Sequence, residues 1–117
     1  MSRLNMEDSI LEGPIIKNGL KYGVTALPGT GNATLDADMG PVIAMTPTAA
    51  RVLTLPAVTA DMRGLTFYVV NGAAFTLTVN NASAAPVAVV PATIGATGMI
   101  VCLGDAALGI GGWSGGL

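Results

Sequence analysis

Apolar and polar positions alternate in short runs over the second two thirds of the chain, and turn residues separate these runs. From about Pro41 the runs are "PVIAMT", "RVLTLP", "LTFYVV", "FTLTVN", "PVAVV", "GMIVCL" and "LGIGGW". The run "FTLTVN" places Phe75, Leu77 and Val79 on one face, whereas "TFYVV" is apolar on both faces, which is typical of a strand covered on both sides. No helical period of useful length follows Pro41. The sequence therefore predicts an all-β domain.

The clearest local signal lies between two of these runs. In "VVNGAAFTL" the pair Asn71-Gly72 tolerates positive φ angles where the runs meet, which predicts a β-hairpin, with a four-residue connection as an alternative. Prolines flank the runs and do not interrupt them. The expected fold is a small antiparallel β-sandwich, with a jelly-roll-like arrangement or a barrel left open.

The beginning of the chain has a different character. It lacks a sustained apolar period, and glycine and proline interrupt it at seven positions up to Gly31. We therefore expect residues 1–40 to form an extended N-terminal arm and residues 41–117 to form the β domain. Such an arm would become ordered by lying on another surface.

Charge separates the two parts further. Of the 117 residues 10% are charged, where a soluble domain usually has about a quarter, and 51% are hydrophobic. Six of the charged residues lie in the first 21 positions, and Asp105 is the only one from Leu65 to Leu117. A free monomer with so neutral a surface would expose apolar patches and strand edges. We therefore expect the β domain to be covered by copies of itself, in a closed ring of two or three subunits, while the arm docks elsewhere.

Composition also excludes several functions. The chain has no histidine and one cysteine, so neither a zinc cluster nor a histidine-based catalytic pair can be assembled. We expect no enzyme activity and no catalytic, cofactor or metal site, with Asp36 and Asp38 solvating a loop and Cys102 buried as a small hydrophobe. The net charge of −2 argues against nucleic acid, and the prolines of "AAPVAVVPATIGATGMIVCL" argue against a membrane-spanning helix.

The β region resembles a module of tailed-bacteriophage virion proteins. In that module a Thr-Leu-Pro strand, a glycine before an aromatic strand, a Val-Asn hairpin, a Thr/Val-alternating strand and a final Gly-Asp and Trp recur. The resemblance covers about residues 51–113, although the stretch "ALGIGG" before Trp113 is longer than usual. The matching positions are Leu55, Pro56, Gly64, Phe67, Val70, Asn71, Thr78, Val79, Asp105 and Trp113.

The resemblance implies a capsid decoration (cement) protein that is made in the host cytoplasm, oligomerises on the capsid surface of the virion, with a trimer favoured, and binds the major capsid protein. The alternative is a receptor- or glycan-binding tip of a phage head or tail fibre, with Trp113, Tyr68 and the Thr/Asn-rich loops in contact. The expected oligomer interface contains Phe67, Tyr68 and Trp113. The residues expected to bind the capsid are Arg3, Leu4, Met6, Ile10, Leu11, Ile15, Ile16, Leu20 and Tyr22.

Overall fold

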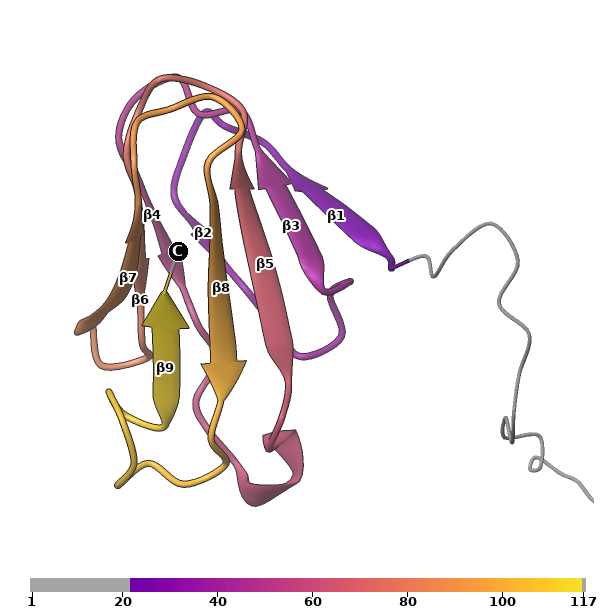
Figure 1. The fold of residues 1–117 in the computed structure, drawn as a ribbon, viewed down its shortest axis with the longest axis vertical. Coiled ribbons are helices and arrows are strands. Elements are labelled where there is room, and N and C mark those ends of the chain that lie inside the picture. The colour runs from indigo at the N-terminus through magenta and orange to yellow at the C-terminus, as the bar shows by residue number, and fades with distance from the viewer. Residues whose placement is uncertain (1–21, 117) are drawn as a thin grey trace, which may run out of the picture.

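The computed structural model describes residues 22–116, which form strands, one short 3-10 helix and connecting loops (Figure 1). No α-helix occurs in this part of the chain. The 3-10 helix η1 spans Ala60–Met62. The strands are β1 (Val24–Leu27), β2 (Ala33–Thr34), β3 (Val42–Met45), β4 (Arg51–Thr54), β5 (Thr66–Asn71), β6 (Leu77–Asn80), β7 (Pro86–Val90), β8 (Thr97–Cys102) and β9 (Trp113–Gly116).

The strands form two mixed sheets with a shared core. One sheet has the strand order β1-β3-β5-β8-β9, and the other has the order β2-β4-β6-β7. We call them the five-stranded and the four-stranded sheet. Buried residues of both sheets belong to one hydrophobic cluster, so the two sheets share one core between them. The expected all-β character is confirmed.

The first six strands wind alternately through the two sheets. Odd-numbered strands enter the five-stranded sheet and even-numbered strands the four-stranded sheet, so β1, β3 and β5 run parallel, as do β2, β4 and β6. Each turn of this winding stacks on the previous one in a fixed register, in which Val24 faces Val42 and Val42 faces Tyr68. The expectation of antiparallel sheets is therefore wrong for these pairs, and it holds for β5–β8, β6–β7 and β8–β9.

The predicted hairpin at Asn71-Gly72 is also wrong, because β5 and β6 lie in different sheets. The buried Asn71 side chain stabilises the crossing between them. Its Nδ2 donates to the carbonyl oxygens of Phe75 at 2.6 Å and Pro91 at 2.9 Å, and its Oδ1 accepts from the N–H of Ala73 at 3.1 Å. Asparagine side chains that bond the backbone two residues on are equally suited to a crossing loop and to a hairpin, so local sequence alone does not separate them.

The last three strands close one side of the molecule. Strands β6 and β7 form a hairpin, the chain crosses to β8, and β9 returns along the far edge of the five-stranded sheet. Here β9 lies so close to β7 that a Cβ atom added to Gly115 would be 2.9 Å from the carbonyl oxygen of Val87. At the other side of the molecule, β1 is the edge strand of the five-stranded sheet and β2 is the edge strand of the four-stranded sheet. No described strand pairs with the outer side of either.

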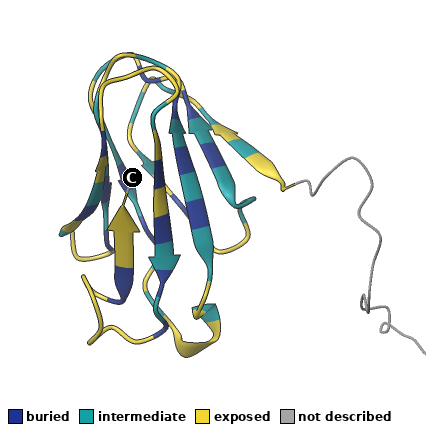
Figure 2. Ribbon diagram, viewed as in Figure 1, coloured by how far each residue is buried: buried dark blue, intermediate teal, exposed yellow. Residues whose placement is uncertain are grey.

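Alternate side chains of each central strand point into the core (Figure 2). In β5 the side chains of Phe67, Val69 and Asn71 are buried, whereas the residues between them are only partly covered. Phe67 stacks on Trp113 with ring centroids 6.2 Å apart. Cys102 is a free, buried thiol in this core, as predicted.

Residues 22–40 belong to the β domain, which corrects the boundary expected at residue 40. They contain β1 and β2, and Leu35 is buried in the core with 1% of its side chain exposed. The sequence misled here because β1 and β2 are short and lie between glycines and prolines, so neither shows a sustained period. The remaining part of the expected arm, residues 1–21, lies outside the described residues.

The long uncharged stretch "AAPVAVVPATIGATGMIVCL" forms β7, a loop and β8. Among the described residues no helix has the length and hydropathy needed to cross a membrane.

Candidate functional site

The outer faces of the two sheets are the most distinctive surfaces of the described chain, and they differ in chemistry. On the four-stranded sheet Thr34 lies beside Thr54, and Thr54 lies beside Asn80. In the next row Thr78 lies between Val52 and Val89. Hydroxyl and amide groups therefore occupy much of this face.

The outer face of the five-stranded sheet is mainly apolar. One row crosses it in the order Val24, Val42, Tyr68, Met99 and Gly116. A second row contains Ala26, Ala44, Val70 and Thr97. Strands β3, β5 and β8 contribute their outward positions to both rows. We refer to the outward residues of these two rows, together with Tyr22, as the apolar face.

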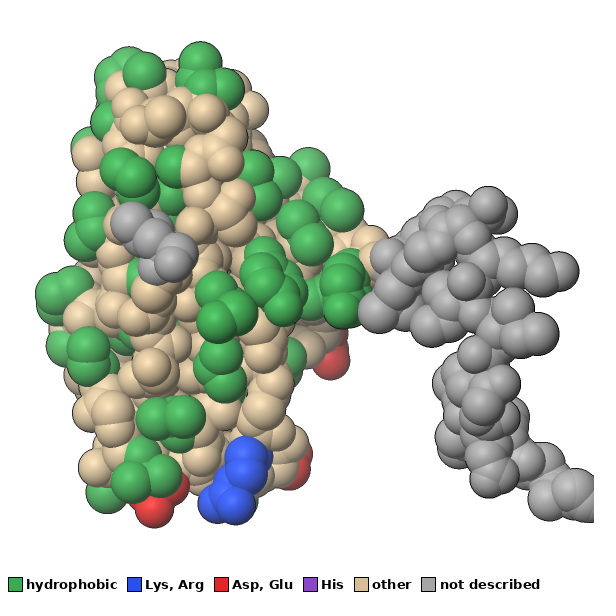
Figure 3. Space-filling view, in the orientation of Figure 1, with side chains coloured by type: hydrophobic (Ala, Val, Ile, Leu, Met, Phe, Trp, Pro, Cys, Tyr) green, Lys and Arg blue, Asp and Glu red, His purple; other side chains and the backbone are tan. Residues whose placement is uncertain are grey.

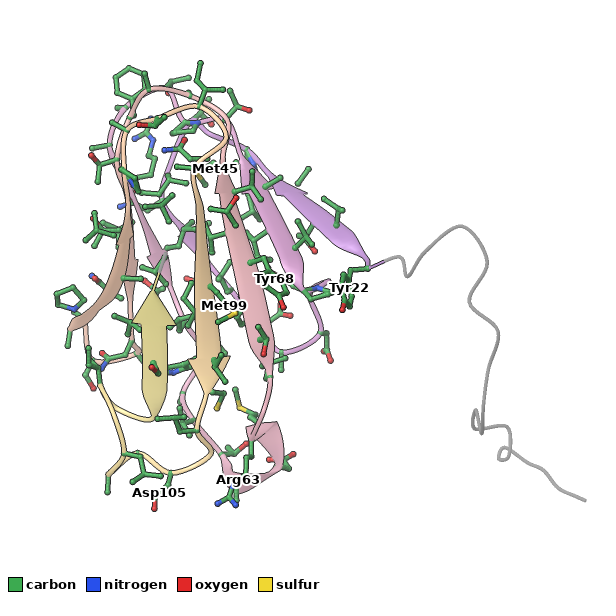
Figure 4. The ribbon with its side chains drawn as sticks, in the orientation of Figure 1. Tyr22, Met45, Arg63, Tyr68, Met99 and Asp105 are labelled. Carbon is green, nitrogen blue, oxygen red and sulfur yellow. The ribbon has the colours of Figure 1, made fainter. Side chains whose placement is uncertain are left out.

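Several side chains of the apolar face are unusually exposed. Val24 is 64% exposed, Tyr22 is 55% exposed and Met99 is 46% exposed. Tyr22 leans toward Tyr68 with ring centroids 6.3 Å apart, so two aromatic rings lie side by side on this face. Figure 4 shows Tyr22, Tyr68 and Met99 spread across the strands, and Figure 3 shows hydrophobic side chains over the same region.

The charged side chains of the described residues lie away from the apolar face. Asp36, Asp38, Asp61, Arg63 and Asp105 lie in η1 or in loops, and Arg51 begins β4 of the other sheet. Arg63 and Asp105 lie at the lower end of the molecule in Figure 4. The outward rows of the five-stranded sheet, including a third row of Thr66, Val101 and Ser114, are therefore free of charge.

One carboxyl group has a shifted titration. The hydroxyl of Thr59 donates a hydrogen bond to Asp61, and backbone hydrogen bonding adds to it, so the pKa of Asp61 is below its usual value. A hydrogen bond donated to the ionised form favours that form. The carboxyl group is fully exposed on η1, and it belongs to no cluster of three or more potential metal ligands among the described residues.

A small pocket opens beside the loop before β9. It has a volume of about 360 Å³, and its walls include Val58, Asn81, Ser83 and Trp113. The Asn81 side chain is already engaged, because its Oδ1 accepts from the N–H groups of Ser83 and Ala85 at 2.9 and 3.0 Å. The walls carry no ionisable side chain, so the pocket has no acid–base chemistry. The described residues also contain no cluster of three or more potential metal ligands.

The structure separates the three residues expected at an oligomer interface. Phe67 and Trp113 have no exposed side-chain area, because they stack on each other inside the core. Including them in an interface is therefore wrong, and the aromatic character that suggested a contact surface instead stabilises the single chain. Tyr68 lies on the apolar face and is available for contact.

Of the residues expected to bind a capsid, Tyr22 is described, and it lies exposed at the start of β1. Arg3, Leu4, Met6, Ile10, Leu11, Ile15, Ile16 and Leu20 lie outside the described residues. Sequence reasoning missed Val24, Val42 and Met99 as surface residues. The available signal was the strand "TFYVV", which is apolar on both faces, although a single chain covers only one of them.

Comparison with known proteins gives this chain no relative. Neither a protein-family model, nor a curated protein, nor a solved structure matches it.

Proposed function

We propose that this protein is a structural virion protein, a capsid decoration protein that self-associates on the capsid surface and stabilises the shell. The proposal begins from the resemblance of residues 51–113 to phage virion modules. One structural observation supports it above the others: a five-stranded sheet presents an uncharged apolar face on the outside of a small domain. A surface of this kind is typical of a protein that works in an assembly.

The proposed partners are the major capsid protein and further copies of this chain, with a trimer favoured. The N-terminal segment, residues 1–21, is the proposed capsid contact, because it holds six charged residues next to a domain that has few. Binding to the assembled shell would stabilise it, since a ligand that prefers one state shifts the equilibrium toward that state. Several weak contacts held by one oligomer would give strong attachment.

The finer fold assignment belongs to the same proposal. We prefer a β-sandwich to a closed barrel, because the strands form two separate sheets. Each sheet ends in an open edge strand, β1 in one and β2 in the other. A jelly roll is disfavoured by the parallel pairing of the first six strands.

The alternative, a glycan- or receptor-binding fibre tip, loses its main residue. Trp113 was the expected aromatic platform, and it is buried. The decoration protein is therefore the function that we propose alone.

The direct test is to purify virions of the phage that encodes this chain, to quantify the chain in them by mass spectrometry, and to add the full-length protein to capsids stripped of it. We expect saturable binding and a higher temperature of capsid disruption. Full-length protein with Ile15→Asp and Ile16→Asp should bind more weakly, whereas Val89→Asp on the polar sheet should bind as the wild type does. Absence of the chain from virions would overturn the proposal.

A further inference from the structure

The size of the apolar face can be estimated from the geometry of the sheet. Strands about 4.8 Å apart give a five-stranded sheet a width of about 19 Å, and strands of four to six residues give a length of about 13–20 Å. The face thus presents about 250–400 Å² in projection. The largest apolar patch of a typical monomer is about 300–600 Å² and often functional, so this face, on a chain of 117 residues, is comparable in size to such a patch.

The edge beside this face is unprotected among the described residues. Edge strands usually carry a charge, a proline or a bulge that prevents pairing with another chain. Strand β1 has the sequence Val-Thr-Ala-Leu and pairs with β3 in continuous register, so it has none of these features. At the opposite side β9 is packed against β7 at Gly115. The open edge and the apolar face meet at Val24, which at 64% exposure is more exposed than Met99 in the same row.

The number of charged residues in each possible occupant indicates which of them covers the apolar face. In a typical soluble domain about a quarter of the residues are charged, and covering a charged group with an apolar face costs its hydration. The segment 1–21 has six charged residues, whereas the apolar face has none. A second apolar face of the same kind brings no charge, and two pleated sheets pack face to face about 10 Å apart.

We propose that the apolar face is the surface through which copies of this chain associate with one another. The inference rests on the proposed function in one respect, because it names the surface for the self-association that the proposal requires. Val24, Val42, Tyr68 and Met99 of one copy pack on the same face of the next. Two identical faces packed on each other form an isologous contact, which closes as a two-fold dimer, whereas a trimer requires the three faces to meet around a three-fold axis.

The area of the face indicates the class of interface to which it belongs. A standard interface buries about 800 Å² per partner, so this face alone gives an interface of the smaller, weaker class. Association is therefore expected to depend on concentration in the micromolar range, about 1–100 μM.

The test compares the same substitution at two exposed valines, one on each sheet. Val24 on β1 and Val89 on β7 are both exposed valines on edge strands, at 64% and 50% exposure. Full-length wild type, Val24→Asp and Val89→Asp are compared by native mass spectrometry and sedimentation equilibrium from 1 to 500 μM. We expect Val24→Asp to raise the dissociation constant at least tenfold, because it buries a charge at the contact, and Val89→Asp to leave it within about twofold.

A second variant tests the same surface in case Val24→Asp does not fold. Met99→Gln lies on central strand β8, where it keeps a similar side-chain volume, and it should weaken association about three- to tenfold. The fluorescence of Trp113, the only tryptophan and fully buried, reports whether each variant is folded. A wild type that stays monomeric at 500 μM overturns the inference, as does equal weakening by Val24→Asp and Val89→Asp. These measurements contain no capsid, so their failure is distinct from absence of the chain from virions.

Discussion

The two sheets of this protein share one core but present different outer faces. The four-stranded sheet exposes Thr34, Thr54, Thr78 and Asn80, whose hydroxyl and amide groups hydrogen-bond water without any charge. The five-stranded sheet exposes a row from Val24 to Met99 in which the hydroxyl of Tyr68 is the only side-chain hydrogen-bonding group for water. The difference teaches that low charge alone does not mark an interface. Among uncharged surfaces, we propose that those with few hydroxyl and amide groups are the ones that a partner covers.

The arrangement of the loops strengthens this comparison. Five of the six charged residues in the described chain lie in η1 or in loops at the side where β2, β4, β6 and β8 end, and only Arg51 lies in a strand. Arg51 turns toward the first loop, where its Nε donates to the carbonyl oxygen of Gly29 at 3.0 Å. Charge therefore solvates the connections between strands and leaves both sheet faces neutral.

The largest expected effect is a difference in unfolding free energy between substitutions on the inner and outer sides of strand β5. Phe67→Ala should lower the free energy of unfolding by about 3–5 kcal/mol, because it removes a fully buried ring that stacks on Trp113. Tyr68→Ala, the next residue, should cost less than about 1 kcal/mol in the dissociated chain, since its ring lies outside the core. Urea unfolding of both variants at 1 μM measures the difference. Equal losses would mean that the outer face is packed within the single chain.

The next effect concerns two asparagines that are each the last residue of a strand. Asn71→Ala should lower the free energy of unfolding by about 2–3 kcal/mol, because it leaves the carbonyl groups of Phe75 and Pro91 without their donor. The matched control is Asn80→Ala on the polar outer face, which should cost about 0.5 kcal/mol or less. Thermal unfolding followed by circular dichroism gives both values. If the control lost as much as Asn71→Ala, the polar face would have a structural role beyond contact with water.

A third experiment attempts to convert one face into the other. Replacing Thr54 and Thr78 together by valine removes two hydroxyl groups from the polar face at nearly constant volume. We expect a second self-association surface, seen in light scattering as species larger than those of the wild type, with a rise in mean mass of about twofold at 100 μM. Folding should be unaffected, because valine suits a strand at least as well as threonine. An unchanged mass would show that hydroxyl groups are not what keeps this face free.

The smallest expected effect lies at η1, away from both faces. Thr59→Val removes the hydroxyl that donates to Asp61, so the pKa of Asp61 should rise toward its usual value. The pKa is lowered in the folded chain, so the stabilising contribution of Asp61 is present above its unfolded pKa and is lost as the pH falls through the folded value. An NMR titration of the Asp61 carboxyl carbon measures the shift. No change in association should accompany it, and a change would place η1 in the interface.

Parts of the fold could be predicted from local patterns. The runs at "PVIAM", "TFYVV", "LTVN" and "MIVC" each contain a strand, because alternating β-branched and apolar residues specify extended backbone wherever they lie. The partner of each strand could not be predicted. The hairpin expected at Asn71-Gly72 is a crossing between sheets, since a turn signal says that the chain bends and not which sheet it enters next.

The candidate site divides in the same way. Low charge in the β region is a property of composition, and it indicated a partner before any fold was known. Aromatic identity was a poor guide to the surface, because Phe67, Tyr68 and Trp113 differ in burial by strand register and not by residue type. Adjacent residues in a strand point to opposite faces, and only the packing of the two sheets decides which face is inside.

The sequence by itself thus determined that this protein is built from short strands with an almost uncharged β region, because both are local or compositional properties. Tertiary structure alone decided that the strands wind in parallel turns through two sheets, that Val24, Val42, Tyr68 and Met99 meet in one row, and that Trp113 lies inside. Those outcomes depend on contacts between residues far apart in the chain, and the core buries whichever face the winding turns inward.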